Sequence, residues 1–113
     1  MDLKIEATAG PREGVKIVRL SGPFTLPSVF EFQSVVRSLN EPVAIVDLSE
    51  VPFMDSAALG AVMFLHASAQ KNQRQYALVG ASKRLHDLFK VVGVDEILVT
   101  YPTMAEAQAK LIS

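Results

Sequence analysis

Apolar segments of strand type alternate with segments of helical periodicity over the C-terminal two thirds of the chain, and this alternation limits the fold more than any other feature. The strands are expected at 43–48, 75–80 and 96–101, and the helices at about 56–70, 82–93 and 103–111. Ser82 is expected to cap the second of these helices and Gly93 to end it, and Thr103 with Glu106 has the spacing of a capping box for the third. Strands joined through a helix pair in parallel by right-handed crossovers. The nearly continuous apolar run VAIVDL is typical of a central strand that is covered on both faces.

The N-terminal third predicts an antiparallel hairpin followed by a helix. Residues 3–8 alternate apolar and polar side chains, the turn sequence GPREG follows, and VKIVRL (15–20) is the second strand. Ser28 and Glu31 have the spacing of a capping box, which predicts a helix from about 28 to 39. Its inward side chains are expected to be Val29, Phe32, Val36 and Leu39.

Together these elements predict the order β-β-α-β-α-β-α-β-α in a single α/β domain over residues 1–113. The sheet is expected to be mixed and mostly parallel, with the N-terminal antiparallel hairpin at its edge. A chain of 113 residues is long enough to enclose one core without a disulfide or a structural metal.

Charge and composition exclude several classes of protein. The net charge is −1 and the basic residues are scattered, so we expect no nucleic-acid surface. The absence of cysteine excludes disulfides and thiolate chemistry. The longest apolar run, 57–65, is far shorter than the ~20 residues that span a bilayer, and the N-terminus lacks the apolar core of a signal peptide. We expect a cytoplasmic protein without membrane insertion.

Templates for enzyme active sites are also missing. The sequence has no Gly-rich phosphate loop of the common kinds and no G-x-S-x-G motif. His66 and His86 each lie on an expected helix without a second ligand at metal-binding spacing. Asp47 and Glu50, near the end of the central strand, remain an alternative Mg²⁺ site. We therefore expect no catalytic residue, no cofactor and no metal.

Asp55 and Ser56 begin the helix after the central strand, at the edge of the sheet where α/β domains place their sites. One interpretation is structural, with either side chain capping the helix. The other is functional, because residues 57–65 carry no polar side chain on any face: the side away from the sheet is either shielded by the neighbouring helix or left as a patch for a partner. Phosphorylation of Ser56 would add about −1.5 to −2 charges at pH 7 and oppose the docking of that partner.

The segment VDLSEVPFMDSAALGAVMFL (46–65) resembles the signature of the anti-sigma factor antagonists, the founding members of the STAS domain family. That signature is an apolar strand, then D-L-x-x-(V/L)-x-(F/Y)-(M/I)-D-S-(S/A/T)-G-(L/I)-G, then an apolar helix. The later segment SKRLHDLFKVVGVDEIL (82–98) is also similar to the family. The resemblance extends over essentially the whole chain in the same order of elements.

The resemblance implies an anti-sigma factor antagonist that binds an anti-sigma factor with serine-kinase activity and so releases a sigma factor. It implies that this kinase phosphorylates Ser56 and switches binding off, and that a serine phosphatase restores it. The partner-binding residues are expected to be Met54, Asp55, Ala57, Leu59, Gly60 and Met63. Phe30, one position off the inward face of its helix, is a further candidate for an exposed contact.

Two departures from the family pattern leave alternatives open. Ala58 stands where the family usually has glycine, and Pro23 and Thr25 stand where it commonly has acids. The second departure favours an alternative function, a non-switching STAS module in a transport or scaffold assembly. Nucleotide binding or hydrolysis is a third alternative. The sequence leaves open a homodimer, the sigma pathway and the signal.

Overall fold

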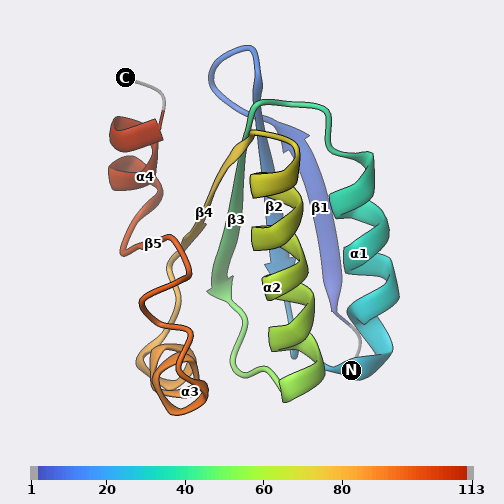
Figure 1. Ribbon diagram of the computed structural model, residues 1–113, viewed down its shortest axis with the longest axis vertical. Coiled ribbons are helices and arrows are strands. Elements are labelled where there is room, and N and C mark those ends of the chain that lie inside the picture. Colours follow the sequence, from blue (N-terminus) through green and yellow to red (C-terminus); the bar gives the residue numbers. More distant parts are fainter. Residues whose placement is uncertain (1–2, 112–113) are drawn as a thin grey trace.

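The structure, a computed structural model, describes residues 3–111. This range contains a five-stranded sheet with the strand order β1-β2-β3-β4-β5 (Figure 1). The strands are β1 (Lys4–Ala9), β2 (Val15–Ser21), β3 (Val43–Glu50), β4 (Gln75–Val79) and β5 (Thr100–Tyr101). β1 is antiparallel to β2, and the other neighbours are parallel. The predicted mixed sheet, with an antiparallel hairpin at its edge, is confirmed.

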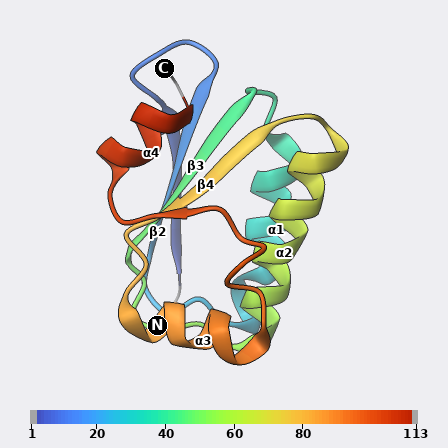
Figure 2. The same ribbon diagram turned by 60° about the vertical axis from the view of Figure 1, so that its left-hand side comes forward.

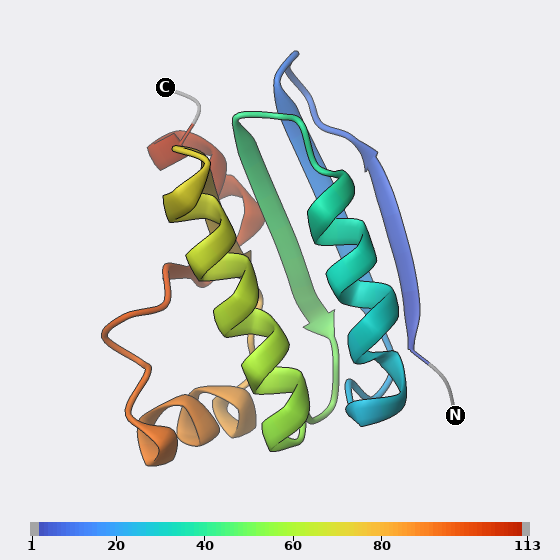
Figure 3. The ribbon, with the colours of Figure 1, turned by 45° about the vertical axis from the view of Figure 1, so that its right-hand side comes forward.

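Helices cover both faces of the sheet, and a further helix lies across one end of it. They are η1, a 3-10 turn (Leu26–Ser28), α1 (Val29–Ser38), α2 (Ser56–Lys71), α3 (Lys83–Val92) and α4 (Met104–Leu111). Figure 2 shows α1 and α2 on one face and α4 on the opposite face. Figure 3 shows that α3, the start of α2 and the start of α1 lie at the same end of the domain.

The main core fills the space between the sheet and the pair α1–α2. Phe24 and Phe32 are fully buried there, and their ring centroids lie 5.1 Å apart. The predicted inward face of α1 is confirmed, because Val29, Phe32, Val36 and Leu39 are all buried. Burial of these side chains orients α1 against α2 and fixes the start of α1 beside the start of α2.

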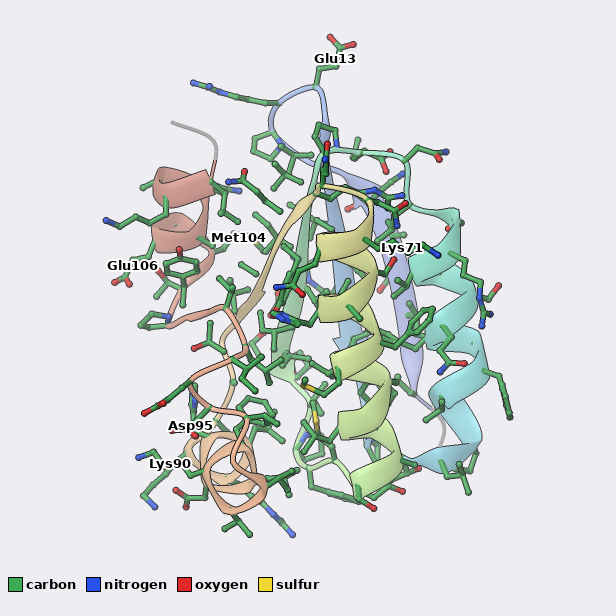
Figure 4. All side chains as sticks on the ribbon, viewed as in Figure 1. Glu13, Lys71, Lys90, Asp95, Met104 and Glu106 are labelled. Atoms are coloured by element: carbon green, nitrogen blue, oxygen red, sulfur yellow. The ribbon has the colours of Figure 1, made fainter. Side chains whose placement is uncertain are left out.

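A second, smaller core lies between the other face of the sheet and α4. Figure 4 shows Met104 directed from α4 towards the sheet and Glu106 directed away from it. Ile45 of β3 enters this core, whereas Val46 next to it enters the main core. Successive side chains of a strand point to opposite faces, so the continuous apolar run of β3 reflects cover on both sides.

Three predicted helix signals, at Ser82, Gly93 and Thr103, are confirmed, and the predicted capping box at Ser28 is wrong. Ser82 Oγ accepts a hydrogen bond from the Leu85 N–H at 3.3 Å, and Gly93 ends α3 with φ +87°. Thr103 Oγ1 accepts one from the Glu106 N–H at 3.2 Å. Ser28 makes no capping bond, because it already belongs to η1 and has helical backbone angles (φ −97°, ψ −3°).

The predicted strand at 96–101 is also wrong over most of its length, since only Thr100–Tyr101 pairs with β4. The preceding residues form a turn, in which the N–H groups of Ile97 and Leu98 both donate to the Val94 carbonyl at 3.0 Å. Leu98 is buried, and it anchors this turn to the main core. The turn therefore satisfies backbone groups that the prediction assigned to a sheet.

Candidate functional site

Ser56 is the first residue of α2 and follows the short loop that leaves β3 at the carboxyl edge of the parallel strands. Its side chain is exposed and makes no hydrogen bond to another residue between 3 and 111. Lys71, labelled in Figure 4, marks the opposite end of the helix. The hydroxyl is thus free in the solvent at the positive end of a 16-residue helix.

Asp55, not Ser56, caps α2. Its Oδ1 accepts a hydrogen bond from the Ala58 N–H at 2.8 Å, and its backbone is extended, as an N-cap residue requires. Its Oδ2 accepts a second bond from the Leu26 N–H of η1 at 3.0 Å. Both oxygens of the Asp55 carboxylate therefore accept backbone N–H groups. Asp55 stabilises the local structure, whereas Ser56 takes no part in the cap.

The segment that precedes α1 is fastened to the loop that precedes Ser56. Phe24 donates its N–H to the Phe53 carbonyl at 3.1 Å, and its carbonyl accepts from the Asp55 N–H at 3.2 Å. These bonds form an isolated parallel bridge between Phe24 and Met54. With the contact between Leu26 and Asp55, they hold the start of α1 in a fixed position relative to Ser56.

One stripe of α2 remains open to solvent. Ser56, Gly60, Met63 and Ala67 follow each other at i, i+4, i+7 and i+11, a spacing that places them on one helical face. Ser56, Gly60 and Ala67 are exposed and Met63 is half-buried. We call these four residues the open stripe.

Most of the rest of α2 is covered by its neighbours, as the apolar run 57–65 requires. Ala58, Ala61, Val62, Leu65 and Ala69 are buried in the main core. Phe64 is half-buried under α1, where the Arg37 guanidinium lies 5.3 Å from the centre of its ring. The helix is therefore enclosed on most of its circumference, and the open stripe is its only long uncovered face between residues 56 and 71.

The expected partner-binding residues divide into surface and core positions. Asp55 and Ala57 are half-buried beside Ser56, while Gly60 and Met63 belong to the open stripe. Met54 and Leu59 are buried, with 7% and 3% of their surface exposed, because both side chains point into the main core. Contact of Met54 and Leu59 with a partner stays a prediction. Their place in the structure is beneath the surface.

Exposed apolar side chains flank Ser56 on both sides. Leu26 and Phe30, one helical turn apart, are 59% and 76% exposed. On the other side, Phe53 is 37% exposed, and the Arg84 guanidinium of α3 lies 5.4 Å from its ring centre. A shallow groove of about 310 Å³ continues from there between Phe53, Met54, Arg84, Leu88 and Val91. The exposure of Phe30 was expected from its helical position, whereas that of Leu26 was not.

Asp47 has a structural role. Its Oδ1 accepts from the Ser49 N–H at 2.9 Å and its Oδ2 from Arg19 Nε at 3.2 Å. Desolvation by burial raises the pKa of Asp47, but the bonds from Ser49 and Arg19 outweigh it and hold that pKa below its ordinary value. Within residues 3–111 no group of three potential ligands can hold a metal ion. The alternative of an Mg²⁺ site at Asp47 and Glu50 therefore has no third His, Cys, Asp or Glu ligand among the described residues.

The two histidines lie in different surroundings, neither next to Ser56. His66 Nδ1 lies 2.7 Å from Tyr76 Oη, which also accepts a bond from the Val99 N–H at 3.2 Å. Desolvation by burial raises the pKa of Tyr76, and the Val99 bond opposes that rise only in part. His86 lies edge-on to Phe89, with ring centroids 5.8 Å apart.

Among the helices that the structure describes, none has the length and apolar character of a membrane-spanning helix.

Comparison with known proteins identifies the family of this arrangement. A family model described as "STAS domain" matches residues 7–107. The chain is similar to the anti-sigma-B factor antagonist of Listeria monocytogenes, with 35% identity over 75 residues. That alignment covers 66% of this chain and 66% of the Listeria protein, just under two thirds of each.

Solved structures share the fold at low sequence identity. An anti-sigma factor antagonist from Mycobacterium paratuberculosis has a TM-score of 0.83 and 20% identity, with 99% of this chain and 96% of that chain covered. The phosphorylated form of the Bacillus cell fate determinant SpoIIAA has a TM-score of 0.73 and 16% identity, covering 95% and 98%. A sulfate transporter family protein from Wolinella succinogenes has a TM-score of 0.80 and 23% identity, covering 89% and 87%.

Proposed function

The chain belongs to the STAS domain family, and from this premise we propose that it is an anti-sigma factor antagonist switched by phosphorylation of Ser56. In its unmodified form it binds an anti-sigma factor that is also a serine kinase. This binding releases the sigma factor that the anti-sigma factor had held. The kinase transfers phosphate to Ser56 and ends the interaction, and a serine phosphatase reverses the modification. We propose a cytoplasmic location, because sigma factors act on RNA polymerase there.

The observation that carries the proposal is the exposed, unbonded hydroxyl of Ser56 at the head of the open stripe. A kinase reaches this oxygen without unfolding the domain. Because Asp55 rather than Ser56 caps the helix, a phosphate on Ser56 leaves the cap in place. The helix N-terminus favours an anion, which lets the modified domain keep its fold.

The same phosphate opposes a partner on the open stripe. A dianion of about −1.5 to −2 charges must lose water when an apolar partner covers it, and this desolvation costs free energy. The carboxylate of the neighbouring Asp55 also repels the phosphate, because both groups are negatively charged. Ala57, Gly60 and Met63 are the proposed contact residues, with Met54 and Leu59 supporting them from the core. A local change of charge thus controls an interface without a change of fold.

The proposal is tested with purified candidate anti-sigma factor kinases from the source organism, ATP and Mg²⁺. Intact-mass measurement should find one phosphate on the wild-type chain and none on Ser56→Ala. Ser56→Ala should bind the kinase as the wild type does, whereas Ser56→Asp should bind at least about 100-fold more weakly. Ser34→Asp, which places the same charge on an exposed residue of α1, is the matched control. Equal affinities of Ser56→Ala and Ser56→Asp would reject the switch.

The second candidate is a non-switching STAS module of a transport or scaffold assembly. Pro23 and Thr25, which stand in the segment fastened to the Ser56 loop, favour it because they supply no acid there. The fold shared with the sulfate transporter family protein is compatible with it. Binding to a purified transport subunit that is insensitive to Ser56→Asp, with no phosphate transfer from any kinase, would favour this candidate.

A further inference from the structure

Leu26 and Phe30 form an exposed apolar patch at the start of α1, which we call the α1 patch. Single exposed apolar residues are common on protein surfaces, but these two lie one turn apart and are 59% and 76% exposed. Their continuous helical backbone, η1 followed by α1, places them on neighbouring turns. Burial of such side chains by a partner contributes more to affinity than burial of small or polar ones.

Hydrogen bonds fix the α1 patch next to Ser56. The Leu26 N–H donates to Asp55 Oδ2 at 3.0 Å, and Asp55 immediately precedes Ser56. Phe24, two residues before Leu26, is bonded on both sides to the loop that carries Phe53 and Asp55. The patch therefore cannot move independently of the head of α2. Any partner that covers Ser56 meets the patch in the same orientation.

The surface continues on the other side of Ser56 with a different character. Arg84 stacks on Phe53, and Lys90 lies on the same helix, α3, at this end of the domain (Figure 4). Asp87 on α3 is already paired with Lys83 at 2.8 Å. Arg84 and Lys90 form no ion pair within the described residues 3–111. Asp95 and Glu96 closely follow α3 and balance part of its positive charge, so the cation that this flank offers is Arg84 beside Phe53, while the PFTLP segment (23–27) beside Ser56 carries no charge.

We propose that the α1 patch selects the partner: an anti-sigma factor that places apolar side chains over Leu26 and Phe30 and carboxylates opposite Arg84. The inference rests on the proposed function, because it assigns the partner of the Ser56 surface. Charge complementarity argues for a partner carboxylate at Arg84, and the bonded continuity of the patch with the Ser56 loop argues for an apolar contact there. Recognition at the α1 patch is hydrophobic and is not weakened by salt screening.

The test measures the affinity of the kinase that phosphorylates Ser56, by calorimetry, for single variants of the chain. Leu26→Ser and Phe30→Ser should each weaken binding by about 10- to 100-fold. Ile97→Ser is the matched control, because Ile97 is 46% exposed on the segment between α3 and β5, and it should change affinity less than about twofold. Circular dichroism and thermal unfolding should show that all three variants fold as the wild type does.

The dependence of affinity on salt concentration distinguishes the apolar contact at the α1 patch from the charged contact at Arg84. The loss caused by Phe30→Ser should not shrink as salt rises, because an apolar contact is not screened. The loss caused by Arg84→Gln should shrink as salt rises, because the Debye length falls from about 10 Å at 0.1 M to about 3 Å at 1 M. An effect of Phe30→Ser that disappears at high salt would contradict a hydrophobic contact.

The outcomes distinguish this inference from the proposed function. Wild-type affinity of both Leu26→Ser and Phe30→Ser, with binding abolished by Ser56→Asp, overturns the inference and leaves the switch intact. Weak binding of the α1-patch variants with full binding of Ser56→Asp supports the docking surface and rejects the switch. A wild-type dimer that Phe30→Ser dissociates, without a change in kinase affinity, shows that a second copy covers the patch and overturns the inference. Failure of every candidate kinase to bind rejects both.

Discussion

Asp55 joins two elements that are far apart in the sequence, because its carboxylate accepts the backbone N–H of Leu26 at 3.0 Å while it caps α2. The acidic residue of the motif therefore builds the site, and the serine beside it is left exposed. This division allows Ser56 to be modified without loss of a structural bond. It also explains how the start of α1 becomes part of the surface around Ser56.

Asp55→Ala should destabilise the domain, since it removes the cap of α2 and the acceptor of the Leu26 N–H. Loss of a helix cap costs about 0.5–2 kcal/mol, and the lost bond to η1 adds to that cost. Urea unfolding monitored by circular dichroism measures the change. Ser56→Ala, which keeps both bonds, is the control and should change the unfolding free energy by less than about 0.5 kcal/mol. A wild-type midpoint for Asp55→Ala would show that neither bond matters.

Gly60→Ala should stabilise the fold and weaken partner binding. Gly60 lies inside α2, and a β-carbon there would meet no atom within 4 Å outside the helix's own backbone. Glycine within a helix is about 0.8–1.0 kcal/mol less favourable than alanine, so the unfolding free energy should rise by about that amount. If the open stripe is the docking face, the added methyl group should raise the dissociation constant for the kinase. Unchanged affinity would remove Gly60 from the contact surface.

Gly80→Ala, in contrast to Gly60→Ala, should destabilise the fold. Gly80 has φ +72°, and a β-carbon would lie 2.9 Å from Ser49 Cβ and 3.3 Å from the Ser49 backbone. Both the backbone conformation and the contact disfavour alanine, so we expect a loss of at least about 1 kcal/mol in unfolding free energy. Thermal unfolding of the two glycine variants side by side should move the midpoint in opposite directions.

Tyr76→Phe should destabilise the turn between α3 and β5. The phenol oxygen accepts the Val99 N–H and bonds His66, and phenylalanine leaves that part-buried N–H without its partner. An unsatisfied buried donor costs about 1–3 kcal/mol. Hydrogen exchange at Val99 should accelerate in the variant, while exchange in β3 should change only as far as global stability does. Tyr101→Phe, at a half-buried tyrosine, is the control.

Asp47 should make stability depend on pH in the acid range. Its folded pKa is lowered from the ordinary 3.8, so the ionised carboxylate stabilises the fold above that value. This contribution is lost as the pH falls through the folded pKa. The advantage of the wild type over Asp47→Asn in urea unfolding should therefore be full at neutral pH and shrink below pH 3.8. A difference that stays constant into acid would assign the effect to packing rather than charge.

The order of elements was predictable from the sequence because hydrophobic periodicity is local. The alternation of strand and helix patterns after residue 43 predicted the parallel part of the sheet, and the hairpin of β1 and β2 followed from its short turn. The N-cap at Ser82 and the stop at Gly93 were also predictable, since a cap depends on residues within one turn.

Tertiary contacts decided the rest. The segment 96–101 (EILVTY) has the composition of a strand, but burial of Leu98 and the bonds to the Val94 carbonyl favour a turn over its first residues. The apolar sequence of α2 could not tell which side would be covered. Packing against the sheet and α1 buries Leu59 and leaves Gly60 exposed. Periodicity and caps depend on neighbours along the chain and can be read from the sequence, whereas accessibility depends on which distant segments fold over each face.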